Sequence, residues 1–541
     1  MKLESFTMMR NYLAGAILAA LAASPAQANN IAFNWNHQWT FRHSAANGST
    51  ALGAEIVAYD EASQNLWVVG TGTGANAALN GIDILSMSGN RINGWSTAAL
   101  GGVNSVDIAN GKAAVSFTAP LKTAPGLVRF YDAANFNVLA DVTVGANPDA
   151  VKFTPNGSRL LVTNEGEPGS YLVGPGGDPV GSVSIIDATT FNAQTAGFAT
   201  FNSQAAALRV AGVRLNGPNA SVAQDLEPEY VAISADGSQA MVTLQENNAV
   251  ALIDIASATV TGIKALGLQD HSLPGNGFDA SDRDGSGSNP LNGNIQNWQV
   301  KGMYMPDAID SFTRGGQQFF VTANEGDARE WPGIADEIRV GNAVIDPALN
   351  TTLTAEHGSD WRSNNDKLNR LLVSTSGDLD GDGDLDELQA YGARSFSILD
   401  ANGNRVFDSG DRIEQIIKSQ FPQLWVDDRS DNKGPEPEGV AIGQINGIDL
   451  LFLGLERSNA IMVWALNDVA NPTFLDMIFT TGNVAPEGLA FFSNAQGSFL
   501  AVANEVSDTT SLYRVNAVPV PGAVWLFGSG LVTLLVARRR T

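Results

Sequence analysis

The chain has 541 residues, with 56 acidic against 31 basic side chains, a formal net charge of −25 and no cysteine. The lack of cysteine excludes disulfides, thiolate metal sites and a cysteine nucleophile. The charge argues against nucleic acid and anionic lipid as partners and favours cation binding or solubility in a saline exterior. The length exceeds one ordinary compact domain, but a fold that grows by adding repeats escapes that limit.

Residues 1–28 have the composition of a secretory signal peptide. Lys2 and Arg10 supply a basic start, residues 13–23 are apolar, and Ala26-Gln27-Ala28 is a small-residue cleavage site. The apolar run is short for an ordinary membrane helix. The sequence therefore predicts an exported protein whose mature part begins near residue 29.

A repeated pattern organises the chain between its two ends. Five copies open with Pro-Asp or Pro-Glu and close near a second glutamate, over residues 148–166, 228–247, 306–326, 437–457 and 486–506. The gaps between the two carboxylates are 16 (149 to 165), 17 (229 to 246) and 18 residues (307 to 325, 438 to 456 and 487 to 505). Such regular spacing is typical of one supersecondary unit repeated along a chain.

Each copy predicts four antiparallel strands. After Glu438 the chain has four short β-branched or aromatic runs, at residues 440–442, 450–453, 460–464 and 474–479, separated by turn residues. A four-stranded unit repeated around an axis is a β-propeller blade. Two weaker copies, at residues 55–69 and 105–116, bring the count to seven, and residues 31–35 are expected to complete the last blade. We therefore predict an all-β, seven-bladed propeller over residues 29–517.

Longer gaps between the copies predict loop insertions between blades 3 and 4, 4 and 5, and 5 and 6. They cover residues 167–224, residues 267–300 and the long segment between Glu325 and Glu438. Insertions in a repeat protein usually gather on one face, which is often the binding face.

An acidic run in the longest insertion resembles a calcium-binding loop. Carboxylates at alternate positions, with Gly383 at the sharp turn, can wrap a hard cation such as Ca²⁺. Gln389 stands where an EF-hand has its bidentate glutamate, so either Glu387 or a distant carboxylate has to complete the shell. A solvated acidic turn is the alternative, and residues 282–286 are a poorer version of the pattern. The predicted metal ligands are Asp378, Asp380, Asp382, Asp384, Asp386 and Glu387.

The repeated carboxylates form a second candidate site. Equivalent residues of the blades lie at equal radius in a propeller, so the two carboxylates of each copy are expected to form two rings. Lining the channel and holding a cation or polar ligand is one role for them, and capping loops is the alternative. One ring is predicted to contain Asp149, Glu229, Asp307, Glu438 and Glu487. The other is predicted to contain Glu165, Glu246, Glu325, Glu456 and Glu505, with Asp327 and Glu436 nearby.

Basic residues accompany these carboxylates in the sequence. Arg329, Arg394 and Lys433 are candidate contacts for an anionic group, and salt bridging is the alternative role for each. No G-x-S-x-G, P-loop, HExxH or dinucleotide fingerprint stands out, and His271 lies alone in a loop. The sequence thus identifies no nucleophile and leaves open whether the protein is an enzyme.

The C-terminal residues 518–541 have the organisation of a sorting signal. A Val-Pro-Val-Pro-Gly stretch precedes an apolar run at residues 524–537 and three arginines at 538–540, the order of a short spanning segment with a cytosolic cluster. The tail resembles VPxPA-type, PEP-CTERM-like signals, with Gly522 where these usually have alanine. The resemblance implies transient membrane anchoring, processing by an exosortase-like sorting protease, and delivery to the cell surface, outer membrane or extracellular matrix.

Long motifs between residues 30 and 516 resemble the choice-of-anchor I family. They lie at residues 148–166, 224–230, 270–285, 321–330, 392–398, 428–440 and 502–507. The resemblance implies a bacterial surface β-propeller held by a C-terminal anchor, in agreement with the tail. It implies no established reaction.

Two classes of function fit these observations. The first is a Ca²⁺-stabilised surface or matrix propeller whose loops bind an exopolysaccharide or a surface protein. The second, by fold analogy with phytase-like and alkaline-phosphatase propellers, is a secreted Ca²⁺-dependent phosphoesterase. The second would need several ions near Glu325, Asp327, Glu436 and Glu438, with Arg329 or Lys433 receiving the phosphate.

Overall fold

The protein is represented by a computed structural model that describes residues 31–49, 52–71, 80–173, 177–284 and 293–519. The predicted signal peptide and nearly all of the predicted sorting signal lie outside these residues. Within the described ranges, no helix combines the length and the apolar character needed to cross a membrane.

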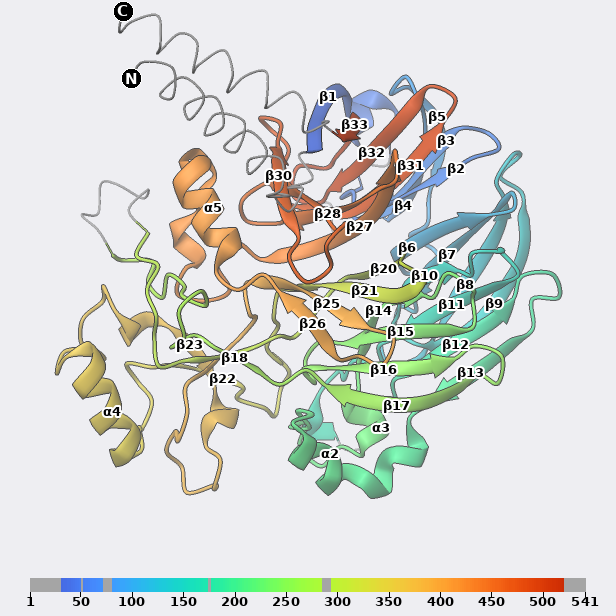
Figure 1. Ribbon diagram of the computed structural model, residues 1–541. Coiled ribbons are helices and arrows are strands. Elements are labelled where there is room, and N and C mark those ends of the chain that lie inside the picture. The colour runs from blue at the N-terminus through green and yellow to red at the C-terminus, as the bar shows by residue number, and fades with distance from the viewer. Residues whose placement is uncertain (1–30, 50–51, 72–79, 174–176, 285–292, 520–541) are drawn as a thin grey trace, which may run out of the picture.

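The described residues form seven four-stranded antiparallel sheets (Figure 1). The first three contain β2 (Ile56–Asp60), β3 (Asn65–Gly70), β4 (Gly81–Ser86) and β5 (Arg91–Ser96); β6 (Gly102–Ala109), β7 (Lys112–Thr118), β8 (Pro125–Asp132) and β9 (Val138–Ala146); β10 (Pro148–Phe153), β11 (Arg159–Asn164), β12 (Ser182–Asp187) and β13 (Ala193–Gly197). The next two contain β14 (Pro228–Ile233), β15 (Gln239–Leu244), β16 (Ala249–Asp254) and β17 (Thr259–Ala265); β20 (Ile309–Arg314), β21 (Gln317–Asn324), β25 (Ser395–Asp400) and β26 (Arg405–Asp408). The last two contain β27 (Pro437–Ile445), β28 (Ile448–Leu455), β29 (Ala460–Ala465) and β30 (Thr473–Ile478); β31 (Pro486–Asn494), β32 (Gly497–Asn504), β33 (Thr509–Pro519) and β1 (Ile31–Arg42).

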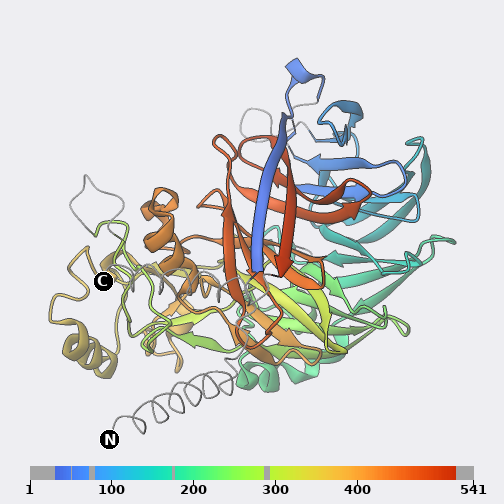
Figure 2. The ribbon, with the colours of Figure 1, turned by 45° about the horizontal axis from the view of Figure 1, so that its top comes forward.

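The seven sheets form a closed ring. The first strand of each sheet contacts the first strand of the next, from β2 through β6, β10, β14, β20 and β27 to β31, and β31 contacts β2. The long strand β1 pairs with β33, so residues from both ends of the described chain share one blade, as the sequence predicted for residues 31–35 (Figure 2). This pairing leaves no open seam between the first and last blades. The predicted all-β propeller fold is confirmed.

Aromatic and β-branched side chains join neighbouring blades. Phe452 of β28 stacks on Phe491 of β31 with ring centroids 5.6 Å apart, and Tyr59 of β2 stacks on Phe492 of β31 at 3.7 Å. Aromatic pairs of this kind contribute about 0.5–1.5 kcal/mol beyond the area they bury. The second contact lies between the last and first blades, so it helps to hold the ring closed.

The predicted position of the longest insertion needs a correction. Residues 325–394 interrupt the fifth blade between β21 and β25, and only residues 409–436, with α5 (Arg412–Gln420), separate blades 5 and 6. The strands β25 and β26, predicted to be part of the insertion, complete the fifth blade. Strands of one blade need to be neighbours in space, not in sequence, so carboxylate spacing alone could not locate this break.

Two insertions pack together beside the propeller into a satellite module, defined here as residues 268–284, 293–303 and 337–390. It contains β18 (Leu268–Asp270), β19 (Lys301–Met303), β22 (Glu337–Arg339), α4 (Pro347–His357), β23 (Leu372–Ser374) and β24 (Gln389–Ala390) (Figure 1). Its own hydrophobic core includes Phe278, Trp298, Leu353, Trp361 and Leu388. The helix α4 begins after Asp346, whose carboxylate accepts hydrogen bonds from the first-turn N–H groups of Ala348 and Leu349.

The insertion between blades 3 and 4 is shorter than the predicted residues 167–224, because β12 and β13 lie within that range and complete the third blade. It contains a 3₁₀ turn at Ala199–Gln204, α2 (Ala205–Ala211) and α3 (Val222–Asp225). Leu208, Val213 and Val222 pack into the core formed by blades 3 and 4. This packing fixes the loop at residues 214–227, which carries part of the site described below.

Candidate functional site

The first strands of all seven sheets line a central cavity of about 430 Å³. Its walls carry apolar side chains such as Val106 and Val151, but also the charged side chains of Asp107, Lys152 and Asp310. The channel therefore offers polar groups along its walls as well as at its ends.

One position repeats in all seven blades at the same end of this channel. It lies two residues before the equivalent paired residues Val57, Val106, Val151, Val231, Ile309, Val440 and Leu489. Six of the seven positions are carboxylates. The position is occupied by Glu55, Asn104, Asp149, Glu229, Asp307, Glu438 and Glu487. We call the six carboxylates the mouth ring, and this end of the channel its mouth.

Irregular strand pairing helps to direct these side chains. The register shifts at the position in five strands, β6, β10, β14, β27 and β31. A β-bulge bends the strand and turns the extra residue away from its regular direction. In four of the five copies, the repeated Pro-Asp or Pro-Glu of the sequence therefore marks a bulge as well as a charge.

The mouth ring is half-buried and its members repel one another. Burial, and then the charges of Glu505 and Asp149, raise the pKa of Glu55 to about 8. Burial raises the pKa of Asp149 to about 7, although Lys122 opposes the change. Burial and neighbouring carboxylates also raise the pKa values of Glu229, Asp307, Glu438 and Glu487 well above their usual range. The carboxylates at this mouth are thus stabilised either by binding protons or, when they are charged, by cations close to them.

A second tier of glutamates stands next to the mouth ring. Glu165, Glu325, Glu456 and Glu505 each follow the second strand of their blade by the same offset. In the fourth blade the register gives this place to Gln245, and Glu246 is the next residue. Glu246 nevertheless reaches the same region, because its ligand atom lies within 4.8 Å of those of Glu165 and Glu229.

Two further groups of carboxylates share Glu325. Ligand atoms of Asp307, Glu325 and Glu438 lie within 4.8 Å of one another, as do those of Glu325, Glu436 and Glu456. Each group offers only oxygen ligands, the kind that hard cations such as Ca²⁺ prefer. A carboxylate common to both groups could bridge two adjacent cations. The predicted ring residues of blades 5 and 6 are thus brought together.

Lys433 lies among these carboxylates. Its Nζ is 2.6 Å from Glu325 Oε1, 3.7 Å from Asp327 and 3.8 Å from Glu436. Burial raises the pKa of Glu436, but Lys433, Arg429 and Arg457 outweigh it and hold this pKa below its usual value. Glu436 also has a φ of +49°, a backbone conformation that is uncommon for glutamate. Of the three predicted anion contacts, Lys433 is the one at the mouth carboxylates.

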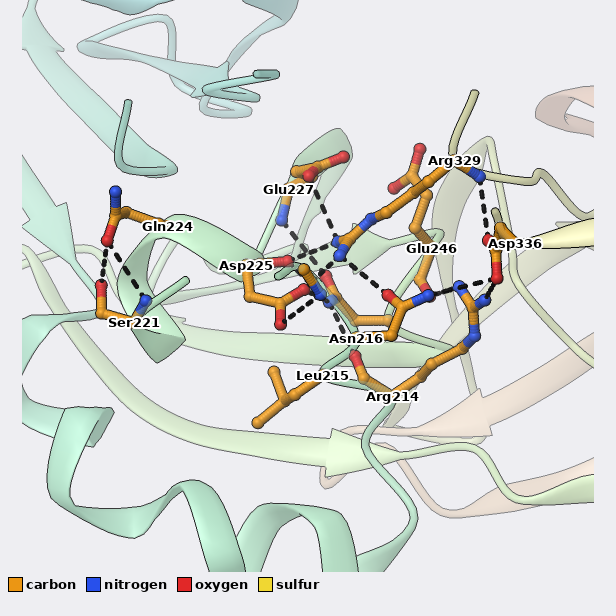
Figure 3. A network of polar contacts seen from close by, with 12 residues as sticks. Arg214, Leu215, Asn216, Ser221, Gln224, Asp225, Glu227, Glu246, Arg329 and Asp336 are labelled. Atoms are coloured by element: carbon orange, nitrogen blue, oxygen red, sulfur yellow. Dashed lines mark hydrogen bonds and ion pairs between the residues drawn. The ribbon is translucent and has the colours of Figure 1, made fainter. Parts of the chain in front are cut away.

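Arg329 is enclosed in a polar network beside the mouth (Figure 3). Its guanidinium pairs with Asp225 and lies 3.2 Å from Glu227 Oε1, and it donates to the Asn216 side chain at 2.9 Å. The main-chain N–H of Arg329 donates to Asp336, which also pairs with Arg214. The network joins the loop at residues 214–227 to the loop at residues 329–336. An anion binding to Arg329 would have to displace these carboxylates.

Arg394 is also buried, and it lies between the satellite module and the segment before blade 6. It donates to the carbonyl oxygens of Asp279, Ser430 and Asn432 at 2.7–2.8 Å and pairs with Glu414 at 3.0 Å. Its described contacts thus connect the satellite module to the segment before blade 6.

In the predicted calcium loop, several carboxylates accept hydrogen bonds from the main chain of the loop itself. Both carboxylate oxygens of Asp378 accept N–H groups, from Gly381 at 2.7 Å and Gly383 at 3.0 Å. Asp384 and Asp386 instead form a ligand group with Asp346, which precedes α4.

Backbone pairing explains how Asp346 reaches this loop. The main-chain N–H of Asp346 donates to Leu385 O at 3.1 Å, and Leu385 N–H donates to Val344 O at 2.9 Å. Asp346 is thus a distant carboxylate that lies beside Asp384 and Asp386, although the sequence marks it only as a helix cap before Pro347. In the same loop, Asp380 and Asp382 accept N–H groups two residues ahead, and Glu387 accepts from the Gln389 side chain.

The fold and its mouth ring define an acidic β-propeller with a carboxylate-lined channel mouth. The choice-of-anchor I domain family matches residues 55–469, and the chain belongs to this family. Membership of this family fits a surface-anchored protein.

Two curated relatives match parts of the chain. Gigasin-3a of Magallana gigas is 32% identical over 127 residues, covering 21% of this chain and 45% of the relative. The mesenchyme-specific cell surface glycoprotein of Strongylocentrotus purpuratus is 25% identical over 267 residues, covering 41% of this chain and 32% of the relative. The chain thus spans less than half the length of these relatives.

Solved structures with a similar course of the chain have little sequence in common with it. Kuenenia stuttgartiensis hydrazine synthase has a TM-score of 0.44 and 11% identity, with 86% of this chain and 96% of that chain covered. The β-propeller domain of Myceliophteria thermophila Cps50 (Swd1) has a TM-score of 0.43 and 7% identity, with 89% and 99% covered.

Proposed function

We propose that this protein is an exported propeller of the cell surface or extracellular matrix that binds Ca²⁺ at its channel mouth. The observation that carries the proposal is the mouth ring, in which carboxylates from six blades converge half-buried on one end of the channel. Isolated charges in such a position are costly. A bound divalent cation replaces the mutual repulsion of the carboxylates with attraction.

Ca²⁺ fits this mouth better than Mg²⁺. Ca²⁺ accepts six to eight oxygen ligands in flexible geometry, whereas Mg²⁺ demands near-ideal octahedral geometry and keeps several waters. The mouth offers glutamates from different blades and no thiolate, since the chain has no cysteine. The groups sharing Glu325 and the group of Glu165, Glu229 and Glu246 are the places where we expect the ions.

The cations also offer a way to hold a partner. The chain has a net charge of −25, so an acidic polymer would be repelled unless a cation bridges the two. A Ca²⁺ held at the mouth can use remaining coordination positions for the hydroxyls or carboxylates of an exopolysaccharide, and a surface protein with exposed carboxylates could bind in the same way. The proposed export signal at residues 1–28 and the proposed sorting signal at residues 518–541 would place the propeller next to such partners.

Calorimetric titration with Ca²⁺ tests the mouth. We expect Asp307→Asn and Glu438→Gln to weaken binding by at least roughly tenfold, the loss that even outer-sphere partners cause at metal sites. Glu61→Gln is the matched control, because Glu61 is exposed in the turn between β2 and β3. Binding of polygalacturonate, compared with neutral dextran and measured in Ca²⁺ and in EDTA, tests the bridging role. Unchanged Ca²⁺ affinity in both variants would refute the proposed site.

A Ca²⁺-dependent phosphoesterase is the second candidate, favoured by one observation. Glu325 belongs to two ligand groups and lies 2.6 Å from Lys433, so two cations and an ammonium could surround one phosphate. Hydrolysis of a phosphomonoester that stops in EDTA and is lost in Lys433→Met would support it. Cation binding without any turnover would favour the binding function.

A further inference from the structure

A third group of carboxylates lies far from the repeats in the sequence, where the satellite module meets the segment before blade 6. Asp279 belongs to the module, Asp284 ends its first described segment, and Asp427 begins the 3₁₀ turn Asp427–Arg429 after α5. Their ligand oxygens lie within 4.8 Å of one another. Three like charges thus lie close together, although the first and the last are 148 positions apart in the sequence (279 to 427).

Two of these carboxylates are buried and have side-chain oxygens without hydrogen-bond partners among the described residues. Asp279 is 0% and Asp284 is 7% exposed, so both are more than nine-tenths buried. Asp279 Oδ2 and both side-chain oxygens of Asp284 are enclosed and accept no hydrogen bond from the described residues. Leaving buried charged oxygens unpaired costs several kcal/mol. The unpaired oxygens of Asp279 and Asp284 would therefore be stabilised by a positive charge placed between them.

The nearby basic side chains have their described hydrogen bonds and ion pairs with other groups. Arg394 pairs with Glu414 and donates to the main-chain carbonyl of Asp279. Lys418 donates to the carbonyl oxygen of Gly293. Arg370 pairs with Asp282, the residue that the acidic motif at 282–286 would have offered as a ligand. Ligand oxygens of Asp279 and Asp284 thus lie within 4.8 Å of each other, and within the described residues these basic side chains form no ion pair with either carboxylate.

We propose that Asp279, Asp284 and Asp427 bind a divalent cation, Ca²⁺ by their oxygen chemistry, that fastens the satellite module to the segment before blade 6. The site is independent of the channel mouth and of the function proposed for it. Main-chain contacts already surround it, since Asp279 N–H donates to Glu414 at 3.0 Å and Asp279 Oδ1 accepts from Ser281 N–H at 3.2 Å. The cation would supply the remaining partners of the three side chains.

A shared proton is the competing way to satisfy this group. Burial and the charges of Asp284 and Glu414 raise the pKa of Asp279 to about 8, and burial raises that of Asp284 to about 6. Protons would therefore occupy the group at neutral pH if no cation did. The two cases predict opposite effects of removing a carboxylate, because an amide can replace a protonated acid but is a much poorer ligand than a carboxylate.

Trp425 provides a local reporter for the cation. Its Nε1 lies 3.3 Å from Asp427 Oδ1, and its ring and Asp279 Oδ2 both border Gly293. Tb³⁺, which replaces Ca²⁺ at oxygen sites, emits when a tryptophan within a few ångströms is excited. Tb³⁺ bound elsewhere on the protein is not excited through Trp425.

The experiment follows Tb³⁺ emission excited through tryptophan in the full protein. The part of the emission lost in Trp425→Phe reports this site, and we expect excess Ca²⁺ to quench it. Asp284→Asn and Asp427→Asn should weaken this Trp425-dependent binding by at least roughly tenfold. Asp366→Asn is the control, because Asp366 is exposed and outside the ligand group.

Each outcome of this experiment decides the proposal. A Trp425-dependent emission that Ca²⁺ quenches and that both Asp variants weaken supports it. Emission unchanged by Trp425→Phe overturns it, and this variant keeps the three carboxylates, so the test stands even where an Asp variant fails to fold. Asp284→Asn that is more stable than the parent in EDTA, with no Trp425-dependent emission, assigns the group to shared protons instead.

Discussion

The channel mouth and the satellite module both gather carboxylates, but they do so by different means. At the mouth, one position of a repeated strand pair is copied around the ring, and six of the seven blades place a carboxylate there. In the module, Asp279, Asp284 and Asp427 meet only because two insertions and the segment before blade 6 fold against one another. The repeat therefore predicts the first site from sequence, whereas only tertiary structure reveals the second.

The two sites also differ in how they depend on the fold. The mouth is held by β-sheet pairing and by contacts between blades, which extend around the whole ring. The satellite module has a separate small core and joins the propeller at its edge. We expect damage to the satellite module to leave the channel mouth intact. Damage to the propeller should affect both sites, because the module rests on the propeller.

The largest expected effect is the pH dependence of the metal-free protein. The pKa of Glu55 is raised from 4.5 to about 8 and that of Asp149 from 3.8 to about 7, so the folded state holds more protons than the unfolded state between about pH 4 and 8. By linkage, stability is full below this window and is lost as the pH rises through it. Ca²⁺ replaces the protons, so it should remove much of this loss.

Urea unfolding at pH 5 and pH 8, in EDTA and in Ca²⁺, checks this expectation. Glu55→Gln removes one of the titrating groups and should flatten the pH profile in EDTA. A metal-free protein that is as stable at pH 8 as at pH 5 would contradict the raised pKa values and the repulsion they express.

Removing Trp361 from the module should separate the two sites. Trp361 is 1% exposed in the module core, and Trp361→Ala should cost roughly 3–5 kcal/mol. We expect hydrogen exchange to rise across residues 337–390 and Trp425-dependent Tb³⁺ emission to fall, while Ca²⁺ binding at the mouth persists. Trp464→Ala, in the core between blades 5 and 6, is the matched variant and should weaken both sites. Equal loss of both in Trp361→Ala would show that the module is not separate.

Lys433→Met tests the charge balance at the mouth. Losing the ammonium leaves Glu325 and Glu436 with less compensation in a largely buried place, so the metal-free protein should lose roughly 3 kcal/mol, the lower figure for a broken buried pair. Ca²⁺ should bind more tightly to the variant, because a competing cation has gone. Thermal unfolding in EDTA and in Ca²⁺ measures both effects, and weaker Ca²⁺ binding would place Lys433 with the ligand instead of against it.

Sequence periodicity predicted the fold and the rings because a propeller repeats its strands in chain order. It also predicted that residues 31–35 close the last blade, which the pairing of β1 with β33 confirms. It could not find that β25 and β26 belong to blade 5, because an excursion of residues 325–394 separates them from β21.

Single residues show the same limit. Gln245 and not Glu246 holds the second-tier position of blade 4, because its first two strands pair in the same register as those of blade 3, and Glu246 lies one residue further past the strand. Asp346 and Asp427 carry only local signals, a helix cap and a turn, so their meeting with distant carboxylates depends on packing that no motif records.

Replacing the one mouth position that is not a carboxylate should have the smallest effect, and it compares the repeat directly with its exception. Asn104 occupies the seventh mouth position, where its side-chain amide donates to Thr118 Oγ1 and to Pro148 O, both at 2.8 Å. Asn104→Asp should cost about 1–3 kcal/mol in EDTA, because the Pro148 carbonyl loses its donor and faces a carboxylate. If the mouth binds Ca²⁺, the added charge should raise its affinity and return part of that loss. Asn104→Ser, which adds no charge, should lose stability equally in EDTA and in Ca²⁺, and the same result for Asn104→Asp would place the cation away from the ring.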